Sequence, residues 1–192
     1  MGLTIHYSGK LRNPSDLQPL IDEATDIAIS MQWHHQRLPF FKDTPLDGVL
    51  ITPEGSEPIW LTFHIAHGML INPILYSYIQ ETTHEDIPED AVSGVFTKTQ
   101  YAGVEKHIAI IKFLRYISEK YFAHFELYDE SNYWETGDEM QCRKVFGRYD
   151  KIIGMVGDAL DSMEIDKDES RDSVIDKIEQ LLEEKFGMKR RN

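Results

Sequence analysis

Residues 104–122 read VEKHIAIIKFLRYISEKYF, and this stretch has the strongest helical pattern in the chain. Its apolar side chains recur three or four residues apart, as they do on one face of an α-helix. Charged side chains, among them Glu105, Lys112, Glu119 and Lys120, lie at other positions, and Gly103 directly precedes the stretch. The pattern predicts a helix that packs a broad apolar stripe against a sheet. The stripe consists of Val104, Ile108, Ile111, Leu114, Ile117 and Tyr121.

Extended segments precede and follow this helix. Some of them alternate apolar and polar residues, as half-buried strands do. Others are short apolar stretches bounded by turn residues, which is also typical of strands. No βαβ unit repeats along the chain, so the sequence predicts an α+β fold, a mainly antiparallel sheet with helices packed on one face. The predicted strands are residues 3–11, 46–52, 59–64, 69–79, 92–99 and 125–129, with a shorter one at 34–38.

Further helices are predicted at both ends of the chain. Asn13-Pro14 is a cap followed by proline at the first helical position, and it opens a helix that runs to about Trp33. Another helix follows Asp138 and ends near residue 163. We therefore expect a single domain over residues 1–163, a charged linker over 164–172 and a C-terminal amphipathic helix over 173–192. Residues 84–90, HEDIPED, are expected to form a surface loop.

Composition limits the partners that this chain can have. Its 20 Lys and Arg against 33 Asp and Glu give a formal charge of −13, which repels nucleic acid and anionic membranes. A single cysteine, Cys142, and the lack of a long apolar run favour a cytoplasmic protein. The same charge favours cations or basic protein surfaces. The expected partner is a small molecule or a basic protein, and a homodimer is compatible with the composition.

Residues 98–107, KTQYAGVEKH, form the first candidate binding segment. They cross from a strand end into a helix N-terminus, where free N–H groups and the helix dipole attract anions. The alternative is structural: the glycine allows the turn and His107 is a partly buried helix residue. The candidate ligand-binding residues of this segment are Lys98, Gln100, Glu105 and His107.

Residues 128–138 form the second candidate segment. With Glu139 they hold five carboxylates and three aromatic residues within twelve positions, enough to ligate a cation or to stack a planar ligand. The alternative is that Trp134 fills the edge of the core and that Thr136 or Asp138 caps a helix. If the two segments meet, Glu130, Trp134 and Glu135 join the first four candidates in one pocket, with His107 and a carboxylate as an acid–base pair.

A polar sheet face is a third candidate. Alternation places one side of each strand opposite the helices, and a curved sheet would turn that side into the wall of a ligand cavity. An ordinary solvated sheet face is the competing interpretation. His64 and His67 face opposite sides if residues 59–67 stay extended, so a metal site between them is not expected. The face contains Thr4, His6, Ser8, Trp60, Thr62, His64, His124, Glu126 and Tyr128.

Three strings resemble a family of uncharacterised conserved bacterial proteins. They are TIHYSGKL (residues 4–11), KTQYAG (98–103) and YWETGDE (133–139), and the resemblance extends over most of residues 3–140. It implies a bacterial cytosolic setting and carries no activity.

Two functions follow as hypotheses. The first is a small-ligand-binding domain, possibly an enzyme, whose site is formed by residues 98–107 and 128–138. The second is an acidic protein-interaction or immunity-type module that binds a basic partner. No P-loop, dinucleotide fingerprint, zinc motif or nucleophile elbow occurs, so the sequence indicates no reaction type, metal or cofactor.

Overall fold

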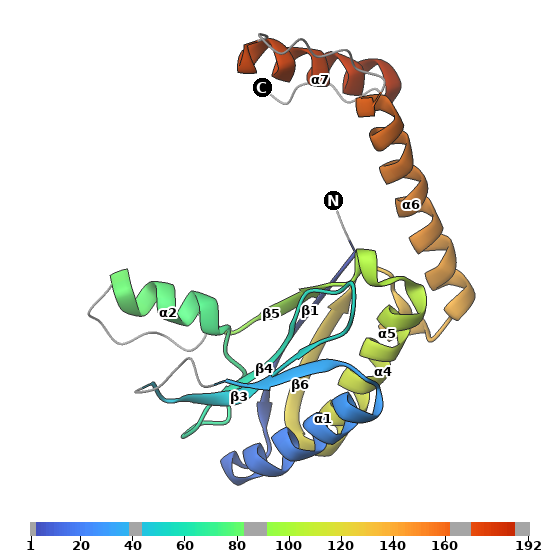
Figure 1. The fold of residues 1–192 in the computed structure, drawn as a ribbon. Coiled ribbons are helices and arrows are strands. Elements are labelled where there is room, and N and C mark those ends of the chain that lie inside the picture. Colours follow the sequence, from blue (N-terminus) through green and yellow to red (C-terminus); the bar gives the residue numbers. More distant parts are fainter. Residues whose placement is uncertain (1–2, 39–43, 83–91, 162–169, 187–192) are drawn as a thin grey trace. The chain divides into compact units, whose positions relative to one another are not determined.

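The computed structural model of the protein describes residues 3–38, 44–82, 92–161 and 170–186 of the 192. The chain divides into two compact units, residues 1–146 and residues 147–192. The described residues of the first unit hold two three-stranded antiparallel sheets together with helices, so the predicted α+β class is confirmed (Figure 1).

The first sheet has the strand order β5-β1-β6. Its central strand, β1 (Thr4–Leu11), pairs with β5 (Val95–Lys98) on one side and with β6 (Phe122–Asp129) on the other. Leu3, Ile5 and Tyr7 are buried, whereas His6 and Lys10 are exposed, which is the predicted alternation. One face of this sheet therefore belongs to the core and the other faces solvent.

The second sheet has the order β2-β3-β4 and consists of His34–Arg37, Leu46–Thr52 and Ile59–His64. Two isolated bridges, Lys10 to Met69 and Phe63 to Leu70, run between the sheets along the turn that follows β4. The buried Tyr7 hydroxyl also joins them. It accepts a hydrogen bond from the backbone N of Trp60 (2.9 Å) and donates one to the Trp60 carbonyl (3.2 Å).

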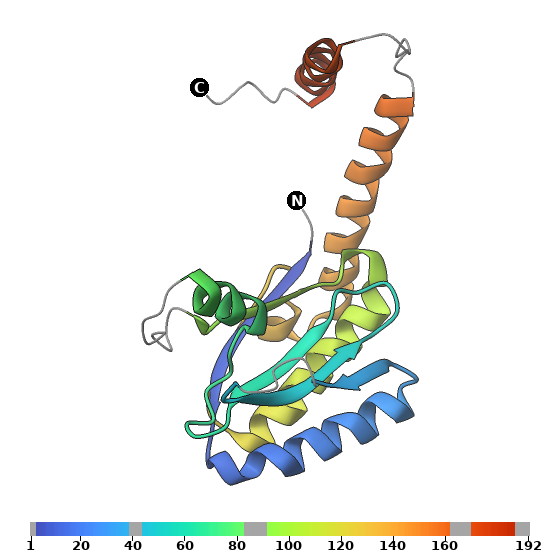
Figure 2. The same cartoon turned by 60° about the vertical axis from the view of Figure 1, so that its left-hand side comes forward.

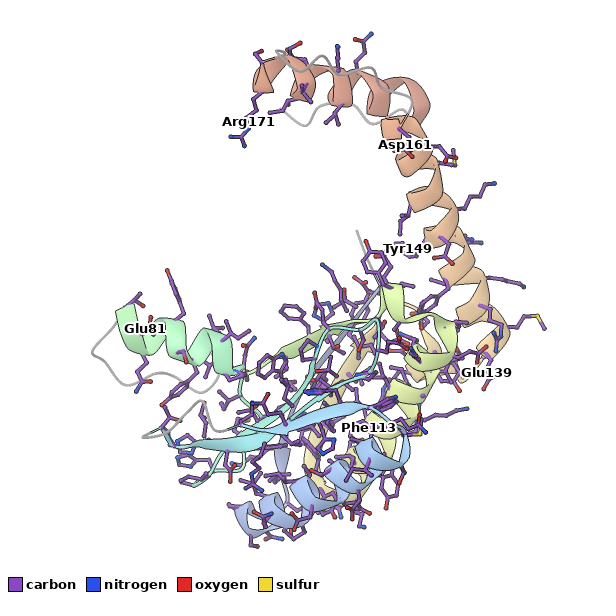
Figure 3. All side chains as sticks on the ribbon, in the orientation of Figure 1. Glu81, Phe113, Glu139, Tyr149, Asp161 and Arg171 are labelled. Atoms are coloured by element: carbon purple, nitrogen blue, oxygen red, sulfur yellow. The ribbon has the colours of Figure 1, made fainter. Side chains whose placement is uncertain are left out.

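Helices α1 (Leu17–Ser30) and α4 (Val104–Tyr121) cover the inner side of the strands. Figures 1 and 2 show them side by side, and Glu23 of α1 accepts hydrogen bonds from Lys120 and Tyr121 of α4. In Figure 3 side chains crowd the space between α4 and the strands, where Phe113 meets Trp33 edge-on with ring centroids 6.0 Å apart. The predicted apolar stripe of α4 thus packs in the core.

The predicted strand over residues 69–79 is wrong, because the chain forms helix α2 (Pro73–Thr82) there. The Asn72 side chain accepts a hydrogen bond from Leu75 N (3.2 Å), and Pro73 stands at the first helical position. This is the same Asn-Pro signal that opens the helix region after Asn13. Leu75, Tyr76 and Ile79 pack on a small cluster around Ile71, so helical spacing determines this segment.

After β6 the chain is helical. A four-residue helix, α5 (Tyr133–Thr136), is followed by α6 (Glu139–Asp161), and α7 (Arg171–Phe186) lies in the second unit. Most of the predicted linker and the whole loop of residues 84–90 lie outside the described residues. The predicted domain boundary at residue 163 stays a prediction.

Candidate functional site

The two candidate segments from the sequence meet at one end of β1. Strand β5 ends where Lys98 stands opposite Thr4, and the Glu130 carboxylate after β6 accepts a hydrogen bond from Thr4 N (2.8 Å). The segments therefore lie on either side of the same strand end. What they build there is a buried polar cluster, which we define as Thr99, His107, Asp129, Ser131 and Cys142.

His107 forms the centre of this cluster, and its side chain is completely buried. Its Nδ1 lies 2.7 Å from Thr99 Oγ1, and its Nε2 lies 2.9 Å from Ser131 Oγ and 3.2 Å from Asp129 Oδ1. The Thr99 hydroxyl donates to the Leu3 carbonyl, and the Ser131 hydroxyl donates to Asp129 Oδ2. Each ring nitrogen therefore faces a hydroxyl group, and Nε2 also faces the Asp129 carboxylate.

Asp129 organises the chain that follows it. Its carboxylate accepts hydrogen bonds from the backbone N–H groups of Ser131, Tyr133 and Trp134, which include the first turn of α5. Burial alone would raise the pKa of Asp129, but its interactions with His107 and Ser131 outweigh burial and lower that pKa below its ordinary value. The carboxylate is thus held ionised inside the protein.

Burial argues against a hydrolytic triad in this cluster. A triad places a nucleophilic hydroxyl and a carboxylate on opposite nitrogens of the imidazole, with the hydroxyl open to substrate. Ser131 faces the same nitrogen as Asp129, and Thr99, which faces the other nitrogen, has no exposed surface. The cysteine beside Ser131 is also buried, which raises its pKa. The geometry is that of a structural core, as in the alternative considered for His107.

The other candidates lie around this cluster. Gln100 is buried, Lys98 and Glu135 are exposed, Glu105 pairs with Arg143 (2.5 Å), and the Trp134 ring lies under the Arg115 guanidinium (4.3 Å to the ring centroid). None of the seven candidates lines the two hollows described below. Their role in binding stays a prediction.

The solvent face of the β5-β1-β6 sheet carries three rings in a row across its three strands. His6 stands opposite Phe96 on β5 and opposite Tyr128 on β6, with ring centroids 6.1 and 6.2 Å away. Phe96 keeps 47% of its surface exposed and Tyr128 keeps 61%. We call these three residues the ring row. Exposed apolar patches rimmed by polar residues are a common feature of binding surfaces.

A hollow of about 470 Å³ lies beside the ring row. Gly94, which directly precedes β5, lines this hollow. It carries no side chain, and no atom lies within 4 Å of where a Cβ would stand. Ser8 and Glu126, which stand opposite one another on β1 and β6, supply the polar groups. Among the described residues that line it, Glu126 alone carries a formal charge, and its carboxylate lies 3.2 Å from His124 Nε2.

A second hollow of about 330 Å³ adjoins the first at Val95 and Phe96. Trp60 and Ile74 line its apolar side, and Glu57 supplies its charged group. The predicted polar face is therefore only partly present. Its residues His6, Ser8, Glu126 and Tyr128 line the first hollow. Thr4 is buried and His124 is exposed outside that hollow, whereas Trp60, Thr62 and His64 belong to the other sheet, where Thr62 is buried too. Phe96 was missed, although it alternates with buried Val95 and Thr97.

His64 and His67 do not face opposite sides, contrary to the expectation. Strand β4 ends at His64, and the turn that follows brings the ring centroids to 4.4 Å. His64 Nδ1 accepts a hydrogen bond from Ala66 N (3.2 Å). Among the residues that the structure describes, no group of three or more His, Cys, Asp or Glu could hold a metal ion.

Comparison with known proteins adds no relative: no family model, curated protein or solved structure matches the chain. The resemblance to a bacterial family stays a prediction. Within the described residues, no helix is long and apolar enough to cross a membrane.

Proposed function

We propose that the protein binds a small molecule on the solvent face of the β5-β1-β6 sheet, over the ring row and the hollow beside it. The observation that carries this proposal is the alignment of His6, Phe96 and Tyr128 across three strands next to about 470 Å³ of open space. Solvated strands normally place polar side chains at such positions, because exposed rings contribute little to folding.

The lining indicates the chemistry of the ligand. A planar ring stacks on Tyr128 or Phe96, and the Glu126 carboxylate accepts a hydrogen bond from an N–H group or attracts a positive charge. The second hollow also has a carboxylate, that of Glu57, as its formal charge. A heteroaromatic amine or amidine fits this lining, whereas an anionic ligand would meet carboxylates and a net charge of −13.

Isothermal titration with benzamidine, tryptamine and adenine tests the proposal. Binding by the wild-type protein and its loss in Tyr128→Ala and Glu126→Gln are expected. Glu135→Gln is the matched control, because Glu135 is equally exposed but lies in the segment after β6. If Glu135→Gln lost binding while Glu126→Gln bound the ligand fully, the site would instead lie in residues 98–107 and 128–138.

A second function is favoured by one observation in the second unit. Beyond Phe146 no residue whose side chain the structure describes is buried, and Ile152, Ile153 and Met155 of α6 keep 40%, 37% and 42% of their surface exposed. With the acidic composition, this supports the alternative of an interaction module for a basic partner. Pull-down at low and high salt, with wild type and an Ile152→Ser, Met155→Ser variant, tests it. A captured protein insensitive to both changes would exclude this function.

A further inference from the structure

Strand β6 is the longer edge of its sheet. In residues 3–146, as far as the structure describes them, β1 is the only strand paired with β6. The sequence FAHFELYD contains neither Lys nor Pro, the residues with which proteins usually protect an exposed edge. Ala123 is exposed, and Phe125 and Leu127 are only partly buried. Strand β6 is thus an open edge, and its ladder to β1 is regular from His124 to Asp129.

The alternation of backbone hydrogen bonds between β1 and β6 shows which backbone N–H and C=O groups of β6 point away from β1. Glu130 N donates to the Thr4 carbonyl (3.3 Å), and the ladder places these two residues opposite one another, one step beyond the pair Ile5 and Asp129. Backbone groups in an antiparallel pair point alternately toward and away from the partner. The ladder shifts register between Lys10 and Leu11, which leaves Ala123 without a partner. From His124 onward the even-numbered residues of β6 therefore bond to β1, and Phe125 and Leu127 direct their N–H and C=O groups away from it.

The hydrogen bonds between β1 and β5 agree with this alternation. Thr99 N donates to the Leu3 carbonyl (2.9 Å), so the odd-numbered residues of β1 bond toward β5 and the even-numbered ones toward β6. The outward carbonyl of Asp129 accepts from Asn132 N (2.9 Å). Among the described residues of the first unit, nothing comparable engages the outward groups of Phe125 and Leu127.

We propose that β6 pairs antiparallel with β6 of a second copy of this chain, which joins two β5-β1-β6 sheets into one sheet of six strands. A two-fold axis allows Phe125 to stand opposite Phe125 of the second copy, with Leu127 opposite Ala123. His124 then faces Glu126 of the other copy, and symmetry repeats this pair. An imidazole and a carboxylate directly across a ladder can hydrogen-bond, and such cross-strand pairs stabilise it.

Charge also selects this register over its neighbour. If Phe125 stood opposite Leu127 of the second copy, Glu126 would face itself, and like charges across a ladder destabilise it. The strand is thus complementary to itself through His124 and Glu126, which are both well exposed. A strand from another protein would need the same alternation of a basic and an acidic residue, so a second copy is the occupant that the sequence of β6 fits.

The pairing also changes the hollow on the solvent face. Glu126, Leu127 and Tyr128 of β6 form one wall of that hollow. In the proposed register the second copy places its His124 beside Glu126 and so contributes a side chain to the rim. The pairing itself does not depend on ligand binding.

Sedimentation velocity of the full-length chain tests the pairing. The wild-type protein is expected at twice 22.3 kDa and Leu127→Pro at 22.3 kDa, because proline removes the outward N–H of residue 127 and leaves the bonds to β1 in place. Leu127→Ala is the matched control: it loses the same side chain, keeps the N–H and should remain dimeric. His124→Glu, an exposed substitution, should weaken the dimer by placing like charges opposite one another.

Hydrogen exchange of the wild-type protein decides the matter even if Leu127→Pro fails to fold. The amide hydrogens of Phe125 and Leu127 should exchange more slowly at high protein concentration than at low concentration, by a factor of roughly ten or more. A monomeric wild-type protein would overturn the proposal. So would a dimer that survives both Leu127→Pro and His124→Glu, or amides at these two positions that exchange freely in the dimer.

Discussion

Two faces of the same strands differ in what their polar residues do. Asp129 and Tyr128 are neighbours on β6, yet Asp129 is fully buried in hydrogen bonds to His107, Ser131 and the start of α5, whereas Tyr128 keeps 61% of its surface exposed beside a hollow. Tyr7 and His6 repeat this difference on β1. A titratable residue in a functional-looking segment can therefore be part of the fold, and the free surface lies one residue away.

Removal of the inner carboxylate should have the largest effect. Asp129→Ala leaves His107 and three backbone N–H groups without their acceptor, so the free energy of unfolding should fall by about 3–5 kcal/mol. Urea denaturation followed by circular dichroism measures this. Glu126→Ala, on the outer face of the same strand, should change the free energy of unfolding by no more than about 0.5 kcal/mol. Equal losses of unfolding free energy in the two variants would contradict the difference between the inner and outer faces of β6.

The stability of the protein in acid should also depend on the Asp129 carboxylate. The pKa of Asp129 is lower in the folded protein than in the unfolded chain, so the unfolded chain takes up the proton first as the pH falls. The stability contributed by Asp129 is therefore complete above its ordinary pKa of about 3.9 and is lost below it. Urea midpoints from about pH 5 to about pH 3 should fall less steeply in Asp129→Asn than in wild type. Parallel slopes would contradict an ionised, buried Asp129.

The inner hydroxyl of β1 should matter less than the carboxylate. Tyr7→Phe leaves the Trp60 N–H and carbonyl without their partner between the two sheets, so a loss of about 1–3 kcal/mol is expected from thermal or urea unfolding. His6→Ala on the other face of β1 is the control, with a change of about 0.5 kcal/mol or less. A Tyr7→Phe variant as stable as wild type would show that water replaces the hydroxyl.

Substitutions in the ring row should have the smallest effect on folding. Phe96→Ala and Tyr128→Ala are expected to change the free energy of unfolding by about 0.5 kcal/mol each, because both rings are largely exposed already. Thermal unfolding of the two variants provides the measurement. Losses as large as that of Asp129→Ala would make the ring row a structural element and leave the proposed binding face without support.

Local patterns predicted much of the fold. Helical spacing identified α4, period-two alternation identified β1 and β6, and an Asn-Pro cap identified the start of the helix region after Asn13. The same cap at Asn72-Pro73 was overlooked in favour of the apolar run that surrounds it, so α2 was predicted as a strand. Local signals fail where two of them compete and packing decides between them.

The candidate site shows where local reasoning ends. Residues 98–107 and 128–138 were predicted to come together, and both do lie at the end of β1. Sequence spacing could not show that His107 would be sealed between Thr99, Ser131 and Asp129, because burial depends on which elements cover a side chain. Nor could it place Phe96 beside His6, since that neighbour is set by the register of β5 on β1.

By itself, then, the sequence determined the α+β class, the helix and strand periods and the acidic charge, because these depend on residues close together in the chain or on their sum. Tertiary structure alone decided which carboxylate is buried, which rings share a face and which edge of β6 stays open. Those properties arise from strand order and register, which join residues up to 126 positions apart, such as Thr4 and Glu130.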